Sequence, residues 1–530
     1  MSLDIDRKEM NMKRLGMIAF WGVVAVATLI GLAAVGLRIY KGLGITNLNY
    51  IVPWGLWVAF YIYFIGLSAG SFLLSTMIFV FGIKRFEPIG RIALFSALIA
   101  LNAGLMFVLL DLGHMERFWT VFINRNLFSV LSIEIHFYLL YIVIICSELW
   151  LLMRRDLVRL GQGEGWQARL YRLLSFGSKD TSPESAARDM RLVKILGLIG
   201  LPTAIGVHGG TGALFAVVKA RPMWYGPLFP IIFIVSALAS GAALLTFIVA
   251  FFGRMPKEER TELTLALGKL TAGILTFDLL LIWSEFSIGF YGAIPEDLDA
   301  LRLIVFGPFW WVFWLQQLLF GAIIPIILIL WPKTGRNPYW VGLAGLMVVI
   351  GIFGVRLNIV IPALSMPVLE GLAEAYSVVP APSKAAFTVP AEVVLWLQRG
   401  AILLALATIV AFSLIGWHAT RQKTKTSQSG ASHWVAQVAA GVGIVAIALL
   451  ALSWFGSNST LLSTASANYL ADNFSGLSGI FRFSPVKALY FPSPNEWLTS
   501  IGVIGFTLIL FAIGWQLLPL DIDPHAVEAH

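Results

Sequence analysis

The hydrophobic positions of this chain fall into long runs separated by short polar segments. A helix needs about 20 apolar residues to cross the ~30 Å hydrocarbon core of a bilayer. Runs of this kind predict spans near residues 15–37, 53–82, 91–111, 129–153, 192–219, 227–253, 263–291, 307–331, 339–363, 393–417, 434–455 and 497–519. The pairs within 307–363 and 393–455 are the hardest to count, so we expect about 12 transmembrane helices, within a range of 10–12. The predicted fold class is an all-α polytopic membrane protein.

A second pattern is an internal repeat. The segment GLSAGSFLLS at 66–75 is echoed by ALASGAALLT at 237–246, and each copy begins a set of four predicted spans. Small residues spaced four apart let membrane helices approach closely. We therefore expect two four-helix bundles related by a parallel repeat, with the remaining helices at the periphery. The same offset carries Tyr61 to Ile232, so a site that uses this hydroxyl belongs to the first half.

These patterns divide the protein into five segments. We expect an N-terminal span and loop in 1–48, a first four-helix bundle with the functional site in 49–222, and a second bundle in 223–365. An additional helical hairpin and a long outer loop are expected in 366–496, and a final span and tail in 497–530.

The charge distribution predicts the orientation. Only 12% of the residues are charged, against roughly a quarter in soluble domains. The loops on one side, counted together with both termini, hold 24 Lys and Arg, and the opposite loops hold 10. Positive charge in short loops marks the cytoplasmic side, so both termini are expected there. The net charge of +8 then reflects topology and contact with anionic lipids, and it is not a nucleic-acid signal.

The cysteine content limits the redox chemistry. Cys146 is the only cysteine, which excludes a cysteine-ligated iron–sulfur cluster and a C-x-x-C-H haem attachment within this protein. No metal site is predicted. Redox chemistry here would use a bound small molecule or the centres of a partner. The first apolar run is long enough to span a membrane, so we expect no cleavable signal peptide.

Polar residues gather near the outer ends of the second, third and fourth spans. Asp111 and His114 lie in DLGHMERFW, and Glu134 and His136 lie inside the span that starts near residue 129. Counting ~1.5 Å per residue places Tyr61 at about the same depth as Glu134 and His136. We expect these groups to form one constellation, although ordinary interfacial polar residues remain the alternative for the 109–119 run.

Other ionisable groups lie deeper. His208, flanked by glycines in the fifth span, is either a hydrogen-bonded core residue or a ligand. Charged groups within a membrane tend to pair or to line water. Such groups in the second half are predicted to form a polar path, or alternatively a structural pair of Asp278 with Arg356; the candidates for the path are Lys269, Asp278, Glu285 and Arg356.

Four short motifs, PWGLW…GLSAG, DLGHMERFW, HGGTGALF and ARPMWYGPLFP, make the protein resemble the NrfD/PsrC family of membrane subunits, and in particular the longer branch typified by the hydrogenase anchor HybB. The resemblance covers roughly residues 49–363 and the final span. The family commonly shows Arg-Pro after DLG, where this sequence has His114 and Met115.

The resemblance implies a polysulfide reductase-type subunit that exchanges electrons between the quinone pool and an iron–sulfur, ferredoxin-like partner. It implies bound menaquinone or ubiquinone, no haem in this subunit, and a catalytic subunit of molybdoenzyme or hydrogenase type, with a multihaem cytochrome as a further option. The implied location is the cytoplasmic membrane of a bacterium or archaeon, and coupling to proton translocation remains open.

A quinone carbonyl needs a donor that can also pass a proton, and its ring needs a flat apolar slot. We expect Tyr61 and His136 to donate to the carbonyls, and Asp111 or Glu134 to exchange protons with the outer aqueous phase. The further cofactor-binding candidates are Trp54, Trp57, Phe60, Phe64, His114 and His208. Two other classes remain open, a secondary transporter and a b-haem quinol oxidoreductase subunit that uses His136 and His208.

Overall fold

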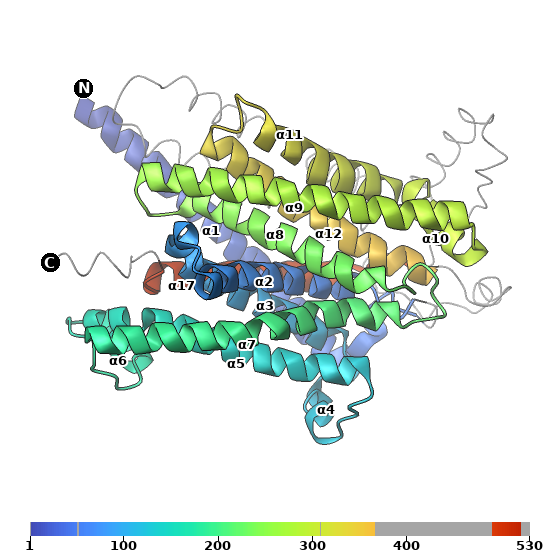
Figure 1. Cartoon of the computed structure of the whole chain (residues 1–530), viewed down its shortest axis with the longest axis horizontal. Helices are drawn as coiled ribbons and strands as arrows, with labels where there is room; N and C mark the ends of the chain where they lie inside the picture. Colours follow the sequence, from blue (N-terminus) through green and yellow to red (C-terminus); the bar gives the residue numbers. More distant parts are fainter. Residues whose placement is uncertain (1, 50–51, 308, 366–489, 521–530) are drawn as a thin grey trace.

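The structure is a computed structural model that describes residues 2–49, 52–307, 309–365 and 490–520. Within these ranges the protein is helical and contains no strand. The helices lie side by side along the long axis of the molecule (Figure 1). They are α1 (Ser2–Lys41), η1 (Gly42–Ile45), α2 (Leu56–Phe81), η2 (Lys84–Ile89), α3 (Gly90–Asp111), η3 (Met115–Arg117), α4 (Thr120–Ile123), α5 (Val130–Leu160), α6 (Trp166–Leu174), α7 (Pro183–Ala216), α8 (Leu228–Phe252), α9 (Lys257–Gly292), α10 (Pro295–Val305), η4 (Val312–Ile323), α11 (Ile324–Leu330), α12 (Pro338–Ser365) and α17 (Pro494–Leu517).

Ten helical segments of the described residues are long and apolar enough to cross a membrane, with mean hydropathy between 1.6 and 2.4. They correspond to ten of the predicted spans, which confirms the all-α polytopic membrane fold. The other two predicted spans, 393–417 and 434–455, lie outside the described residues, as does most of the predicted outer loop. We refer to the end that carries α4 and α10 as the outer end and to the end that carries α6 as the inner end (Figure 1).

The spans form two groups that meet at α2 and α8. In the first group α2 packs on α3 and α7, and α5 packs on α3 and α7; in the second, α8 packs on α9 and α12, and α12 packs on η4 and α11. The groups join symmetrically, because α7 packs on α8 while α12 packs on α2. This arrangement is that of two four-helix bundles whose first helices form the common centre.

The contact between α2 and α8 depends on two glycines. A Cβ atom added to Gly70 would lie 1.9 Å from the carbonyl oxygen of Ala237, and one added to Gly241 would lie 2.2 Å from the carbonyl carbon of Gly70. No side chain fits at either position, so the two backbones touch. Gly70 and Gly241 are matched residues of the repeat predicted from the sequence. The repeated segments therefore contact each other at the centre of the molecule.

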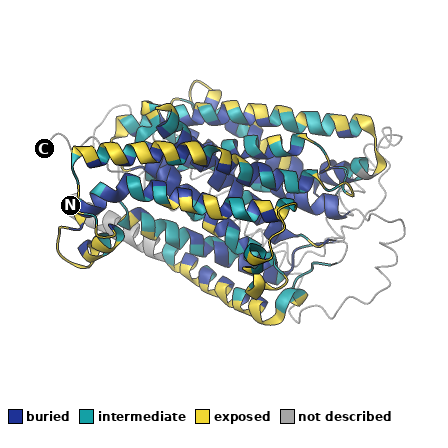
Figure 2. Cartoon of the chain, turned by 60° about the horizontal axis from the view of Figure 1, so that its bottom comes forward, coloured by how far each residue is buried: buried dark blue, intermediate teal, exposed yellow. Residues whose placement is uncertain are grey.

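Burial separates the central helices from the peripheral ones (Figure 2). In the most apolar window of α2, 78% of the residues are buried within the protein, but only 22% are buried in that of the first span. The first span packs against α17, where Gly31 and Gly502 come together so closely that neither admits a Cβ atom. The last span packs in turn on α3 and α2, so the first and last spans cover the first bundle from outside.

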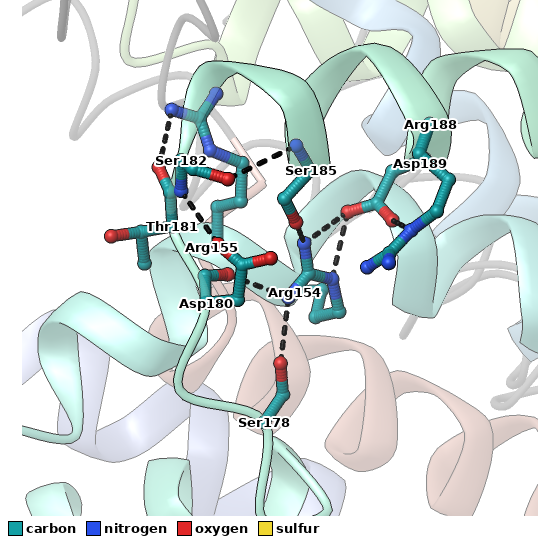
Figure 3. Close-up of polar contacts among 9 residues, drawn as sticks. All are labelled: Arg154, Arg155, Ser178, Asp180, Thr181, Ser182, Ser185, Arg188 and Asp189. Atoms are coloured by element: carbon teal, nitrogen blue, oxygen red, sulfur yellow. Dashed lines mark hydrogen bonds and ion pairs between the residues drawn. The ribbon is translucent and has the colours of Figure 1, made fainter.

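At the inner end, a buried arginine ties the start of α7 to α5 (Figure 3). Arg154 Nε donates to Asp189 Oδ2 at 2.7 Å, and its Nη1 donates to Ser178 Oγ at 2.6 Å and to the Asp180 carbonyl at 2.8 Å. Its Nη2 donates to Ser185 Oγ. The exposed Asp180 carboxyl group accepts a hydrogen bond from Ser182, which lowers the pKa of this carboxyl group. The guanidinium thus holds together the turn that connects α6 to α7.

Candidate functional site

Three hydroxyl groups from three helices converge on one buried carboxyl group in the outer half of the first bundle. Tyr61 Oη of α2 donates to Glu134 Oε1 at 2.6 Å, Tyr138 Oη of α5 donates to the same oxygen at 2.7 Å, and Thr211 Oγ1 of α7 donates to it at 2.5 Å. The two phenol oxygens lie 2.9 Å apart. We call Tyr61, Glu134, Tyr138 and Thr211 the Glu134 cluster.

Local sequence places these groups together. Ser129 caps the start of α5, so Glu134 lies one turn inside the helix and Tyr138 follows on the same face at i+4. Glycines of α7 let that helix approach α5, since a Cβ atom on Gly206 would lie 2.9 Å from the Phe137 ring. The close approach brings Thr211, one turn after Val207, within reach of the carboxyl group.

The cluster leaves one oxygen of the carboxyl group available. All four side chains are buried, with at most 8% of each exposed. Glu134 Oε1 accepts the hydroxyl hydrogen bonds, whereas Glu134 Oε2 is buried and has no hydrogen-bond partner. An unpaired carboxyl oxygen is costly in such a place unless it binds a proton or a ligand. The arrangement can hold one proton and exchange it with a polar atom of a bound molecule.

His136 does not join the Glu134 cluster, which corrects the constellation expected from depth. Its Nδ1 lies 2.7 Å from the Ser132 carbonyl oxygen, and its ring contacts Phe122 edge-on at 5.6 Å between centroids. Two residues along a helix turn the side chain by about 200°, so Glu134 and His136 face different ways at similar depth. His136 remains a predicted quinone donor without a contact to Tyr61.

One aromatic slot was expected from Trp54, Trp57, Phe60 and Phe64, but these side chains pack in three different places. Trp54 stacks on Trp224 at 6.2 Å between ring centroids, and Trp57 donates to Thr499 Oγ1 at 2.9 Å. Phe60 and Phe64 stack with rings of α3 and α12, with Phe60 4.3 Å from Phe353. These residues face different helices, so they do not form one wall of a single slot.

Asp111 and His114 are also separated. The helix α3 ends at Asp111, and His114 follows it outside the helix, so the two residues do not belong to one constellation as the sequence predicted. His114 is exposed and its Nδ1 lies 2.9 Å from Glu116 Oε1. The Glu116 carboxyl group accepts a hydrogen bond from its own backbone N–H and then one from the His114 ring, and both lower the pKa of this carboxyl group. His114 thus lies on the outer surface, away from the buried groups.

Asp111 lies close to two charged side chains that belong to peripheral helices, Arg38 and Glu496. Arg38 of α1 donates from Nε to the Leu110 carbonyl at 3.1 Å and from Nη2 to the Leu112 carbonyl at 2.6 Å, which fixes the end of α3. Both Arg38 and Glu496 interact electrostatically with Asp111, and Asp111 Oδ1 is buried without a hydrogen-bond partner. The outer end of the first bundle therefore contains a second group of buried charges.

The sequence reasoning missed Glu496, Tyr138 and Thr211. Glu496 is fully buried at the start of α17 and accepts hydrogen bonds from the Ser493 and Asn47 amides at 2.8 and 3.1 Å. The S-x-x-E spacing of a capping box could have located it. Tyr138 could have been found from its i+4 spacing to Glu134. The position of Thr211 depends on the packing of α7, for which the sequence carries no direct signal.

His208 faces the interface between the bundles. Its ring is buried 5.4 Å from the Phe233 ring, and a Cβ atom on Gly66 would lie 3.3 Å from its Cε1. Arg356 lies 4.8 Å over the same Phe233 ring and donates from Nη2 to Ser236 Oγ at 2.5 Å. His136 and His208 therefore contact different aromatic residues on different faces of the first bundle.

Of the groups proposed for a polar path, the structure keeps Asp278 and Arg356 together but not Lys269. Asp278 is buried and interacts electrostatically with Arg356, although no direct ion pair forms. Glu285 is half-buried on the same face of α9, seven residues further on. Lys269 is exposed, since nine residues turn the helix by about 180° away from Asp278. The predicted alignment of all three along one path is therefore wrong for Lys269.

The fold and the site define a polytopic membrane protein with a buried carboxyl group, hydrogen-bonded by three hydroxyl groups, in one half of an internal repeat. Residues 44–367, more than half of the sequence, match the family described as polysulphide reductase, NrfD. The chain belongs to this family.

Three relatives extend the comparison. The protein is 45% identical to the C subunit of selenate reductase of Mesobacillus selenatarsenatis, over 68% of this sequence and 85% of the relative. It is 30% identical to the Hdr-like menaquinol oxidoreductase integral membrane subunit of Archaeoglobus fulgidus, over 65% and 79%. It is 26% identical to the C polypeptide of polysulfide reductase of Wolinella succinogenes, over 58% and 93%.

Proposed function

We propose that this protein is the quinone-interacting membrane subunit of a respiratory oxidoreductase complex, with the Glu134 cluster as its proton-exchanging site. The observation that carries this proposal is the buried Glu134 Oε2, which has no partner although three hydroxyl groups fix the other oxygen. Such a group can give a proton to a quinone oxygen or take one from a quinol. The name of the archaeal relative, a menaquinol oxidoreductase subunit, supports menaquinone as the bound species.

The electrons come from or go to a partner in this proposal. A single cysteine, the only one in the sequence, does not hold an iron–sulfur cluster by itself. We propose an iron–sulfur subunit on the outer end of the molecule, next to a catalytic subunit of molybdoenzyme or hydrogenase type. The names of the selenate and polysulfide reductase relatives support a reductase complex. The Lys and Arg distribution supports a cytoplasmic inner end.

Tyr61→Phe tests the proposal. The substitution keeps the ring and removes one of the three hydrogen bonds to Glu134 Oε1. Loss of a buried hydrogen bond of about 1.4 kcal/mol corresponds to about a tenfold change, so we expect quinone turnover by the purified complex to fall about tenfold. The amount of assembled complex should stay the same because the packing volume is preserved.

Tyr63→Phe is the matched control, since Tyr63 lies on the same helix and its ring packs on Phe64 and Phe353. It should keep wild-type turnover. His136→Ala shows whether the separate histidine also acts on the quinone. Wild-type turnover and Michaelis constant in Tyr61→Phe would remove the Glu134 cluster from the proposal.

We propose that the second bundle carries a polar path for proton translocation, because Asp278 Oδ1 is buried without a hydrogen-bond partner. In proteoliposomes, Asp278→Asn should leave electron transfer to quinone intact and lower the number of protons moved per electron. A structural pair with Arg356 would instead give less assembled complex with an unchanged ratio of protons to electrons. The ratio, measured with a pH-sensitive dye, distinguishes the two.

A further inference from the structure

One face of α5 carries buried ionisable groups along nearly its whole length. These groups belong to Glu134, Tyr138, Tyr141, Glu148 and Asp156, and their spacing of 4, 3, 7 and 8 residues keeps them on the same side of the helix. The first and the last are 22 positions apart, which is ~33 Å at 1.5 Å per residue, about the thickness of the hydrocarbon core. Each is at most 6% exposed, and we call these five residues the α5 stripe.

Most members of the α5 stripe have an evident partner. Glu134 and Tyr138 belong to the Glu134 cluster, and Tyr141 Oη lies 3.3 Å from Ser68 Oγ of α2. At the inner end Asp156 Oδ2 accepts a hydrogen bond from Arg91 Nη1 at 2.7 Å, which forms a buried ion pair. Glu148 has no comparable partner among the described residues.

Glu148 lies where α2, α5 and α7 meet. It is 1% exposed, and its Oε1 is buried without a hydrogen-bond partner. A Cβ atom on Gly197 of α7 would lie 3.6 Å from this oxygen and 3.6 Å from Thr76 Cγ2 of α2. Thr76 Oγ1 is also buried and unpaired. Tyr141 is a titratable neighbour that interacts with Glu148 electrostatically.

We propose that Glu148 is a proton-transfer residue that connects the inner end of the first bundle with the Glu134 cluster. Buried ionisable groups within a membrane are costly, and an unpaired carboxyl oxygen at a helix junction that also holds an unpaired hydroxyl group is suited to bind and release protons. This inference rests on the proposed quinone function. In this role Glu148 supplies the quinone site with protons from the inner end, opposite to the outer surface.

Two electrons from the iron–sulfur partner and two protons convert the quinone to the quinol. Each proton that Glu134 gives to a quinone oxygen is replaced by one from Glu148, and Glu148 takes a proton from the aqueous phase at the inner end. Quinol oxidation runs the same transfers in reverse.

Phe72 interrupts the α5 stripe between Tyr141 and Glu148. Its ring contacts Tyr141 edge-on at 5.0 Å between centroids, and it occupies the space beside Gly200, where an added Cβ atom would lie 2.5 Å from Phe72 Cζ. The interval along α5 is ~10.5 Å for seven residues. A continuous file of polar groups would leak protons across the membrane, so the ring restricts transfer to conformations in which water enters this interval.

The test uses the purified complex in liposomes, with reduced viologen as electron donor and menadione as the quinone. In Glu148→Gln we expect kcat to fall about tenfold while the KM for menadione changes by less than about twofold, since proton delivery and not binding is affected. The solvent deuterium isotope effect on kcat should rise, because proton transfer becomes rate-limiting. Glu148→Asp should restore part of the rate, and Glu164→Gln, an exposed glutamate near the inner end, should match wild type.

Two results would overturn the role of Glu148. One is wild-type kcat with a wild-type isotope effect in Glu148→Gln, and the other is a loss of assembled complex with an unchanged isotope effect per complex. If Glu148→Gln does not assemble, Thr76→Val removes the neighbouring hydroxyl group at similar volume, and an unchanged isotope effect there also rejects the proposal. A wild-type complex that cannot reduce menadione rejects the proposed function and this inference with it. Impaired Tyr61→Phe with normal Glu148→Gln rejects only the inference.

Discussion

Glu134→Gln is expected to lower quinone turnover more than any other single change in the first bundle. The amide keeps the size of the side chain and can still accept the hydrogen bonds of Tyr61 and Tyr138, but it cannot take up and release a proton. Loss of a general acid or base costs about 10²- to 10⁴-fold, and we expect a fall within this range. Steady-state turnover of the purified complex, normalised to assembled complex, measures it.

A matched control is Glu184→Gln, which removes a carboxyl group from the exposed start of α7. It should leave turnover unchanged. Glu134→Asp keeps the acid but shortens the side chain, so it should lose less activity than Glu134→Gln. Equal losses in Glu134→Asp and Glu134→Gln would indicate that the shape of the cluster matters and its proton does not.

Arg154→Ala is expected to have the largest effect on stability. Arg154 is 3% exposed, and the substitution leaves the Asp189 carboxylate, 8% exposed, without its buried cation. Removal of one member of a buried ion pair costs about 3–5 kcal/mol, so the free energy of unfolding should fall by this amount. Thermal unfolding in detergent or nanodiscs, together with the amount of complex in the membrane, provides the measurement.

Arg188→Ala supplies a closely matched comparison, because Arg188 contacts the other oxygen of the same Asp189 at 4.0 Å with 63% of its side chain exposed. A pair of this kind contributes about 0–1 kcal/mol. The two variants should therefore differ clearly in thermal stability. Similar small losses in both would show that the network of Figure 3 does not hold the start of α7.

Hydropathy predicted the central spans well. The expected spans 53–82 and 227–253 correspond to α2 (Leu56–Phe81) and α8 (Leu228–Phe252), because bilayer thickness fixes the length of an apolar run. It was less successful at the inner end of α5, which was expected to end near residue 153 and continues to Leu160. There Arg154 and Asp156 are buried by pairing, which a count of apolar residues cannot detect.

The same limit applies to the site. Depth along a helix can be counted from the sequence, and it correctly brought Tyr61 and Glu134 to one level. The direction of a side chain around the helix depends on which neighbour each face meets. Without that knowledge His136 was grouped with Glu134 and Lys269 with Asp278, although the structure turns each pair apart. Thr211 completes the cluster only because α7 approaches α5 through its glycines.

The backbone contact between Gly70 and Gly241 has a mechanical consequence. The crossing of the two helices leaves no room for a side chain, and a shift of α2 by one turn that brought Leu74 there would place a Cβ atom in the space of the Ala237 carbonyl group. If α2 and α8 tilt relative to each other about this contact, a displacement at the outer end is accompanied by an opposite displacement at the inner end. Such a tilt would carry movement from one surface to the other without any change in the length or register of the helices between them.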